Sequence, residues 1–314
     1  MLFPLPADEL FTTGDAVRSG ATARQLEWAV RQGRLHRVRR GVLCAADTWA
    51  GADHGARAAL TARAYVLVAP RTAGVVSHVT AAALLGLPVP ADAADTVWVT
   101  VPPGARPRRD AGLVRQVAAL PAGDVTLVDG VACTTALRTV SDCLRHLPAM
   151  DAVPLADAAL HAGLVGADEL AAFVARHRWP RAAAASELLG LLNGGRESVL
   201  ESQSAVVMHE HGLPRPAEQV RVLDASGRFV GRADFVWVEQ GVVGEADGLS
   251  KYAGEDSARV VAAERRRQAE FAALGLVVVR WTKGMLSGDP PLVVVQMRTA
   301  LADGDGSRFR GRFA

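Results

Sequence analysis

A β-hairpin expected in the last third of the chain constrains the fold more than any other stretch. Its sequence is RFVGRADFVWVEQGVVGEADGLSK, residues 228–251. Phe229 to Val238 and the Val242-Val243 pair are rich in β-branched and aromatic residues, whereas Glu239-Gln240-Gly241 between them is typical of a turn. The stretch therefore predicts two antiparallel strands joined by a tight loop.

Acidic side chains make this hairpin unusual. If the loop is the two residues Glu239-Gln240, Asp234 lies directly across from Glu245, whereas a three-residue loop would shift the pairing by one. Side chains opposite each other in antiparallel strands are roughly 5 Å apart at Cβ, close enough for two carboxylates to share one divalent cation. A single acid near a strand end is commonly just solvated. Asp234 is harder to explain in that way, because it interrupts an apolar run where a charge must be paired, hydrated or bound to metal.

The elements around the hairpin follow a regular order. A helix at about 196–211 carries Glu201 at the edge of its apolar stripe, and a strand at 219–223 leads into the hairpin. A basic helix at about 256–274 and a strand at 276–281 follow the hairpin. The predicted order of this last domain is α-β-β-β-α-β.

This arrangement resembles the PD-(D/E)XK nuclease superfamily, and within it the small domains similar to very-short-patch-repair (Vsr) endonucleases. The similarity covers roughly residues 197–301, and its motifs are ESVLES, GRADF, GEADG and ERRRQAEFAALGLVVVRWT. The resemblance implies a restriction-endonuclease-like αβββαβ core that hydrolyses DNA phosphodiester bonds with Mg²⁺ or Mn²⁺. It also implies that Glu201 joins Asp234 and Glu245 as a metal ligand, with Glu197 as the second choice for the helix residue.

The sequence departs from the superfamily pattern at one position. Asp247 lies two residues after Glu245, where the superfamily usually has a lysine. Three interpretations stay open: Lys251 takes over from the adjacent turn, Asp247 adds a metal ligand as in the Vsr-like branch, or the domain has lost cleavage. Lys251 and Lys283 are the only lysines of the chain. The catalytic set that the resemblance implies is therefore Asp234, Glu245, Asp247 and Lys251.

The first 50 residues predict a small helical DNA-binding unit. One helix is expected at 11–19, and Thr22 can cap a second that runs to Gly33. The following RLHRVRRGVLC alternates apolar residues with arginines, as a β-wing does, and there are five arginines and no acid between Trp28 and Leu43. The segment FTTGDAVRSGATARQLEWAVRQGRLHRVRRGVL resembles the winged-helix N-terminal domain of AbiEi antitoxins from abortive-infection systems.

That second resemblance implies a mode of DNA binding. The helix near 22–32 would enter the major groove, and the arginine hairpin would contact the phosphate backbone. The ordinary alternative is an arginine hairpin that is merely solvated. The residues expected to contact DNA are Arg24, Arg31, Arg34, Arg37, Arg39 and Arg40 in this domain, and Arg265 and Arg267 in the basic helix of the last domain.

The expected fold class is α/β (α+β) with three domains: a winged helix-turn-helix at 1–50, an AbiEi-like middle α/β domain at 51–195 and the nuclease-like domain at 196–314. Asn193-Gly194-Gly195, a strong helix-stop signal, sets the last boundary. In the middle domain we expect strands at 113–117, 125–128 and 131–134, helices at 136–146 and 153–162, and a Pro-rich loop at 106–109. It shows no catalytic constellation. The Gly- and Arg-rich tail from Asp303 is expected to be loose.

Composition narrows the function classes. The formal net charge of +2 over 314 residues argues neither for nor against nucleic acid. Three cysteines without C-x-x-C spacing disfavour a disulfide framework and a zinc knuckle. There is no G-x-x-x-x-G-K-[ST] phosphate loop and no G-x-S-x-G elbow. Because the sequence also lacks a signal peptide and an apolar run near the ~20 residues of a membrane span, we expect a cytoplasmic protein with no membrane association.

Two functional hypotheses follow. The favoured one is a Mg²⁺- or Mn²⁺-dependent DNA endonuclease, targeted by its winged helix and serving in phage defence or a toxin–antitoxin context. The alternative is a non-catalytic DNA-binding regulator or antitoxin that uses an inactive nuclease-like fold. The expected partners are DNA and, for the antitoxin hypothesis, a cognate toxin; the sequence does not indicate an oligomeric state.

Overall fold

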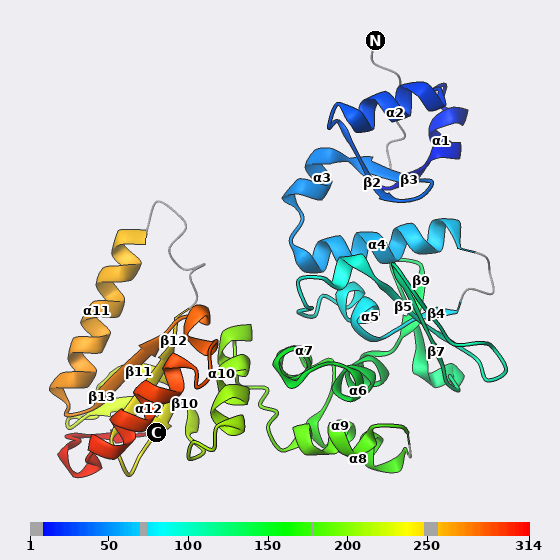
Figure 1. Cartoon of the computed structure of the whole chain (residues 1–314). Coiled ribbons are helices and arrows are strands. Elements are labelled where there is room, and N and C mark those ends of the chain that lie inside the picture. Colours follow the sequence, from blue (N-terminus) through cyan, green and yellow to red (C-terminus); the bar gives the residue numbers. More distant parts are fainter. Residues whose placement is uncertain (1–8, 70–73, 178, 248–256) are drawn as a thin grey trace. The chain divides into compact units, whose positions relative to one another are not determined.

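The computed structural model describes residues 9–69, 74–177, 179–247 and 257–314, with the backbone alone for 257–264. Within these ranges the protein is a mixed α/β structure with three β-sheets (Figure 1). The chain divides into two compact units. The first unit is 1–147 with 164–185, and the second is 148–163 with 186–314.

The first unit begins with a three-stranded sheet and two short helices. These elements are β1 (Phe11–Thr12), α1 (Thr13–Arg18), α2 (Ala23–Arg31), β2 (Leu35–Arg39) and β3 (Val42–Ala45), with sheet order β1-β3-β2. The Thr22 hydroxyl caps α2 and Gln25 completes a capping box, as the sequence predicts. The expected helix at 11–19 begins two residues late, because Phe11 pairs with Leu43 in the sheet. The predicted arginine hairpin is confirmed as β2 and β3.

The rest of the first unit surrounds a six-stranded sheet of order β6-β7-β5-β4-β9-β8. Its strands are β4 (Val75–Val76), β5 (Val97–Val101), β6 (Arg108–Asp110), β7 (Leu113–Val117), β8 (Val125–Val128) and β9 (Val131–Thr134). Its helices are α3 (Ala46–Gly51), α4 (His54–Val68), α5 (His78–Leu84), α6 (Ala136–His146) and α8 (Ala167–Arg176), with short 3₁₀ helices at Ala93–Asp95 and Ala122–Asp124. The strands β7, β8 and β9 and helix α6 have the predicted bounds. The prediction of a loop at 106–109 is wrong in part. Its last two residues belong to strand β6, which pairs with β7.

The second unit is built on a five-stranded sheet of order β13-β12-β11-β10-β14. Its elements are α7 (Ala149–His161), α10 (Val199–Glu210), β10 (Ala217–Asp224), β11 (Phe229–Trp237), β12 (Val242–Ala246), α11 (Ser257–Ala273), β13 (Val277–Trp281), α12 (Leu292–Asp303) and β14 (Gly311–Phe313), with 3₁₀ turns at Lys283–Leu286 and Gly306–Arg308. Helix α9 (Ala182–Leu189) contains the boundary between the units. From α10 to β13 the order is α-β-β-β-α-β, as predicted.

Helices cover both faces of this sheet. Phe235 and Trp237 lie in a core cluster with buried residues of α10 and α12. The intervening Val236 lies in a second cluster with Val243 of β12 and Phe271 of α11. Ala233 lies in this second cluster as well, so the strict alternation of side chains along β11 is interrupted between Ala233 and Phe235, at Asp234. On β12, Glu245 contacts Arg267 of α11 and therefore lies on the α11 face.

Helix α7 packs in the second unit, although the sequence placed it in the middle domain. Its buried Asp157 accepts hydrogen bonds from Arg196 Nη1 and from Ser202 Oγ, both at 2.7 Å. An arginine paired with a carboxylate across 39 residues leaves no local signal in the sequence. The three-domain division remains a prediction, but α7 cannot be separated from α10 by a cut at residue 195 without breaking this pair.

The C-terminal tail corrects a second expectation. Residues 311–313 form β14, in which Arg312 and Phe313 pair with Leu223 and Val222 of β10. The ring of Phe313 stacks on that of Phe309, with centroids 4.4 Å apart. The tail was expected to be loose because it is short and rich in Gly and Arg. That expectation is wrong, because the unpaired edge of β10 supplies a partner that only the folded sheet creates.

Candidate active site and nucleic-acid interface

The register of the β11–β12 hairpin decides whether its acids meet. Phe235 pairs with Gly244, Val236 with Val243 and Trp237 with Val242. This pairing corresponds to the two-residue loop Glu239-Gln240 that the sequence favoured, and it places Asp234 opposite Glu245. Gly244 packs closely against Trp281 of β13, because a Cβ on Gly244 would lie 2.6 Å from the indole ring. A side chain at position 244 would displace the Trp281 ring from its place in the core.

Glu245 is buried and only half satisfied. Its side chain is 6 % exposed, and its Oε2 accepts a hydrogen bond from Arg267 Nη2 at 2.6 Å. Among the described residues, Oε1 has no hydrogen-bond partner. Burial raises the pKa of Glu245 to about 7; Arg267 opposes the rise, and the neighbouring Asp234 adds to it. A carboxylate oxygen without a partner in such a place is costly unless a proton or a cation occupies it.

Asp234 is held beside Glu245 by the backbone of the facing strand. Its Oδ2 accepts the N–H of Ala246 at 2.9 Å, which anchors the carboxylate on the facing strand. The residue is half-buried. The register therefore places the two acids opposite each other, as the sequence predicted for a two-residue loop.

A cavity of about 580 Å³ opens over this acid pair. Its walls are formed by Glu197, Glu201, Arg221, Phe229, Val230, Gly231, Arg232, Asp234, Glu245 and Arg267. At the cavity wall Arg232 pairs with Glu197 at 2.5 Å, and the Arg221 guanidinium lies 5.2 Å from the centroid of the half-exposed Phe229 ring. Acids and arginines thus line the same hollow, so it can hold both a cation and a phosphate.

Glu201 lines the same cavity but is hydrogen-bonded at the start of its own helix. Its Oε1 accepts from Ser198 Oγ at 2.7 Å, and its Oε2 accepts from Gln219 Nε2 at 2.7 Å and from the Glu197 N–H at 3.1 Å. This is an N-terminal capping arrangement of α10. Its role as a metal ligand, which the resemblance implied, stays a prediction.

The donor set can be tested against the needs of Mg²⁺. Within the described ranges no three His, Cys, Asp or Glu side chains are grouped so as to hold an ion. Mg²⁺ is commonly held by one or two carboxylates together with waters and substrate phosphates, which is less than a full protein cage. Asp234 and Glu245 offer hard oxygens, and Glu245 Oε1 is buried without a partner. These two residues fit the ion as a two-carboxylate site.

Asp247 forms an ion pair with Arg280 and does not line the cavity over the acid pair. Arg280 of β13 donates to both of its carboxylate oxygens, at 2.7 Å from Nε and 2.6 Å from Nη2. A bidentate arginine pair of this kind fixes the carboxylate and neutralises its charge. Lys251, the other residue proposed for the catalytic set, lies outside the described residues.

The predicted DNA-contacting arginines of the first unit differ in their surroundings. Those exposed on or beside α2 and the β2–β3 hairpin are Arg24, Arg31, Arg34, Arg37 and Arg40. Arg37 pairs with Glu27 at 2.5 Å, and the Arg34 guanidinium lies 5.1 Å from the Trp28 ring centroid. Arg39 is half-buried over Tyr65 and donates to the Gly112 carbonyl at 3.3 Å. It is therefore the weakest candidate for a phosphate contact.

The two arginines of α11 that were expected to contact DNA, Arg265 and Arg267, also differ in their exposure. Arg265 is exposed, whereas Arg267 is half-buried and reaches Glu245. The consecutive arginines 265–267 spread around most of a helix, so the sequence predicts that at least one reaches toward the sheet or a bound phosphate, but it does not indicate which one.

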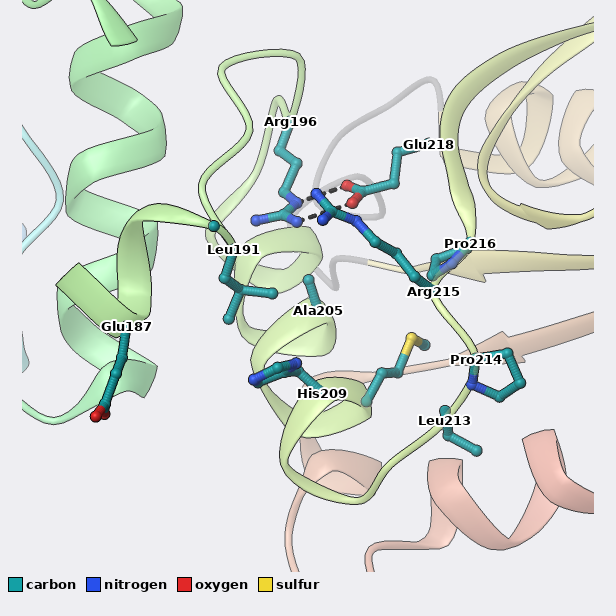
Figure 2. A pocket seen from close by; sticks show the side chains of 12 residues that line it. Glu187, Leu191, Arg196, Ala205, His209, Leu213, Pro214, Arg215, Pro216 and Glu218 are labelled. Carbon is teal, nitrogen blue, oxygen red and sulfur yellow. Dashed lines mark hydrogen bonds and ion pairs between the residues drawn. The ribbon is translucent and has the colours of Figure 1, made fainter. Parts of the chain in front are cut away.

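A second, smaller cavity of about 200 Å³ lies beside α10 and is mostly apolar (Figure 2). Arg196 and Glu218 form its polar wall, joined by hydrogen bonds of 2.6 and 2.9 Å. Because Arg196 also pairs with Asp157 of α7, these contacts tie α7, α10 and β10 together. Their role is to hold the second unit together.

Comparison with known proteins gives two findings. Residues 8–46 match the family described as "Transcriptional regulator, AbiEi antitoxin". Two proteins of Mycobacterium tuberculosis, uncharacterized protein Rv2248 of strain H37Rv and uncharacterized protein MT2308 of strain CDC 1551, are each 31% identical to this chain over 204 residues, which are 64% of this chain and 71% of theirs. This chain belongs to the same family as these mycobacterial proteins. The family membership itself assigns no activity, since both relatives are named as uncharacterized.

In this family member the AbiEi match covers the three-stranded sheet with α1 and α2. The N-terminal domain is thus AbiEi-antitoxin-like, as its sequence indicated, and the family description links such domains to transcriptional regulation. Within the described ranges no helix is long and apolar enough to cross a membrane.

Sequence reasoning missed several residues around the cavity. Arg280 was not singled out, although it follows three valines in an apolar run of β13 and lies beside Glu245 in the parallel register. Arg221 and Phe229 were also missed. The pairing of Arg221 with Arg232 across β10 and β11 puts two cations on the same face, a signal that becomes visible only once the register is known.

Proposed function

We propose that this protein is a metal-dependent DNA endonuclease that is brought to DNA by its N-terminal AbiEi-like domain. The observation that supports it best is the acid pair itself. Asp234 and Glu245 lie opposite each other on one hairpin, and the buried Oε1 of Glu245 faces no partner among the described residues. The α-β-β-β-α-β order around the pair agrees with the nuclease superfamily that the motifs resemble.

Asp234 and Glu245 would hold Mg²⁺ or Mn²⁺ in this proposal. When bound, the ion would orient and acidify the attacking water and neutralise charge that develops on the phosphate. Asp234 enters the site with a fixed orientation, because the Ala246 N–H holds its Oδ2. Glu245 is kept in a low-dielectric environment, where its charge interacts strongly with a cation.

The arginines of the cavity would hold the DNA strand. Arg221 and Arg232 are exposed, pair with each other across β10 and β11, and line the same cavity as Asp234. Guanidinium groups bind phosphate oxygens in a planar, bidentate manner. The exposed Phe229 ring beside Arg221 adds a surface on which a base can stack. We propose Arg24, Arg31, Arg34, Arg37 and Arg40 as the DNA contacts of the AbiEi-like domain.

The proposal is tested with supercoiled plasmid and single-stranded DNA incubated in Mg²⁺, in Mn²⁺ and in EDTA. We expect metal-dependent nicking by the wild-type protein and none by Asp234→Asn or Glu245→Gln. Glu239→Gln is the matched control, because it makes the same chemical change at an exposed position of the same hairpin. Cleavage that persists in both site variants would show that another protein or another site is responsible.

A second function deserves testing because two observations favour it. The AbiEi match belongs to regulators, and Arg267 and Arg280 already neutralise Glu245 and Asp247. A non-catalytic transcriptional regulator, with a cognate toxin as partner, would keep these acids as structural ion pairs. In that case DNA binding would be sensitive to salt, equally strong in EDTA and in Mg²⁺, and accompanied by no cleavage of any substrate.

A further inference from the structure

Arg267 forms an ion pair with Glu245, one of the two acids, and the proposed nuclease mechanism does not explain this contact. Its Nη2 donates to Glu245 Oε2 at 2.6 Å, and the arginine side chain is one-third exposed. It therefore contacts both the buried carboxylate and the open cavity. In the superfamily pattern the residue two positions after Glu245 supplies positive charge, whereas here that residue is Asp247.

The structure makes room for the Arg267 stem. A Cβ on Gly231 would lie 2.9 Å from Arg267 Cδ and 3.2 Å from its Cγ. Phe271, one turn further along α11, is fully buried in the sheet core and anchors this part of the helix. The aliphatic stem is thus confined between α11 and β11, while the guanidinium end stays at the cavity.

The other arginine next to the acids is not available in the same way. Arg280, a residue of β13, donates to both oxygens of Asp247. Arg267 binds Glu245 through a single oxygen. A cation that binds Glu245 neutralises the same charge that now holds Arg267, so the two cations compete for one carboxylate.

We infer that Arg267 exchanges partners: it holds Glu245 in the metal-free protein, and it binds a non-bridging oxygen of the cleaved phosphodiester when metal and DNA are bound. This inference rests on the proposed nuclease function and assigns Arg267 as its phosphate-binding catalytic residue. The guanidinium supplies the positive charge that Asp247 cannot. The ion pair also keeps Glu245 from remaining an uncompensated charge when no metal is present.

The exchange makes a prediction that a simple phosphate contact does not. Removing Arg267 removes a competitor of the metal and also a ligand of the phosphate, so metal affinity and cleavage should change in opposite directions. We expect Arg267→Ala to bind Mn²⁺ about fivefold more tightly in the absence of DNA, the fold-change that corresponds to an ion pair worth ~1 kcal/mol. We expect its single-turnover cleavage rate to fall on the order of 10²-fold.

The experiment measures Mn²⁺ binding by titration calorimetry without DNA, and single-turnover cleavage at saturating Mn²⁺, on the same full-length preparations. Arg266→Ala is the matched control, because Arg266 is exposed on the same helix; it should match the wild-type protein in both readouts. Arg267→Lys keeps the charge and guards against misfolding of the alanine variant. It should recover part of the cleavage rate and bind Mn²⁺ close to the wild-type affinity.

The possible outcomes separate the two proposals. If the wild-type protein binds Mn²⁺ and cleaves DNA, but Arg267→Ala and Arg267→Lys both leave the two readouts unchanged, the exchange is overturned and the nuclease stands. Weaker Mn²⁺ binding by Arg267→Ala would also overturn it, because Arg267 would then support the site and not compete with the ion. If the wild-type protein binds no Mn²⁺ and cuts no substrate, the proposed nuclease function is rejected, and the exchange, which rests on it, is rejected as well.

Discussion

At the scale of single residues, Glu245 links stability and function. The folded protein buries its carboxyl group between Asp234, Arg267 and the hairpin, and burial raises its pKa to about 7. The same burial makes an empty site costly and a cation-filled site favourable. Asp247, only two residues away, is already neutralised by a bidentate arginine. The two acids thus differ in their pairing: both oxygens of Asp247 are bound by Arg280, whereas only one oxygen of Glu245 is bound by Arg267.

The first prediction concerns the pH dependence of stability in EDTA. Glu245 has a folded pKa of about 7, above the ordinary 4.5. Below about pH 4.5 the group is protonated in both states and costs nothing. As pH rises towards 7 the unfolded chain ionises first, so the free energy of unfolding falls by on the order of 3 kcal/mol. Urea unfolding across this range should show the fall in the wild-type protein and in Glu239→Gln.

Glu245→Gln should lack that component of the pH dependence, because glutamine does not titrate. The variant should therefore gain stability relative to the wild-type protein as pH rises from about 4.5 to about 7. Parallel stability curves for the two proteins over this interval would mean that Glu245 is not buried as described.

At the scale of elements, the β11–β12 hairpin was the most predictable part of the fold, because a two-residue loop and alternating strands fix its register within a few residues of sequence. The bounds of β7, β8, β9 and α6 were predicted for similar local reasons. The membership of α7 and the pairing of β14 were not, since Asp157 meets Arg196 and Phe313 meets Val222 across long stretches of chain. Likewise, the choice of Arg267 among three adjacent arginines depends on how α11 lies on the sheet.

The second prediction tests the close packing of β12 against β13. Gly244→Ala would place a methyl group 2.6 Å from the Trp281 ring, inside a buried cluster. Overpacking of this kind typically costs about 1–3 kcal/mol, so thermal unfolding of the second unit should shift to lower temperature. Gly284→Ala is the control, because a Cβ there meets nothing within 4 Å. Equal melting temperatures for the two variants would contradict the close packing of Gly244 against Trp281.

The third prediction concerns two arginines of the β2–β3 region: Arg34, just before β2, and Arg40, in the turn between the strands. Each arginine that contacts a phosphate contributes about 0.9 to the slope of log affinity against log salt concentration. Arg34→Ala and Arg40→Ala should each lower that slope by roughly this amount in a DNA-binding titration. Arg18→Ala, in which an exposed arginine is paired with Asp15 within α1, should leave the slope unchanged. If neither variant changes the slope of log affinity against log salt concentration, these two arginines do not contact DNA phosphates.

At the scale of the whole molecule, the AbiEi-like domain that we propose to bind DNA and the acid pair lie in different compact units of one chain. The AbiEi-like domain, which matches a family of transcriptional regulators, lies in the first unit. The acid pair lies in the second unit. We therefore expect the two activities to be separable by substitution.

The fourth prediction tests that separation. Combining Arg34→Ala with Arg40→Ala should raise the KM for DNA and leave kcat nearly unchanged, since the exposed hairpin binds substrate and transition state equally. Asp234→Asn should abolish cleavage and leave DNA affinity in EDTA at the wild-type level. A hairpin double variant that lowers kcat without changing KM would argue against a purely targeting role.

The central claim is that Asp234 and Glu245 together bind a divalent cation, and its most direct test locates the ion without relying on DNA cleavage. Fe²⁺ is substituted for Mg²⁺, ascorbate and peroxide are added, and the polypeptide bonds broken by locally generated radicals are mapped by mass spectrometry. The account predicts cuts within β11 and β12 near residues 234 and 245, suppressed by excess Mg²⁺ and lost in Glu245→Gln but not in Glu239→Gln. Intact strands in the wild-type protein, or cuts that survive Glu245→Gln, would contradict it.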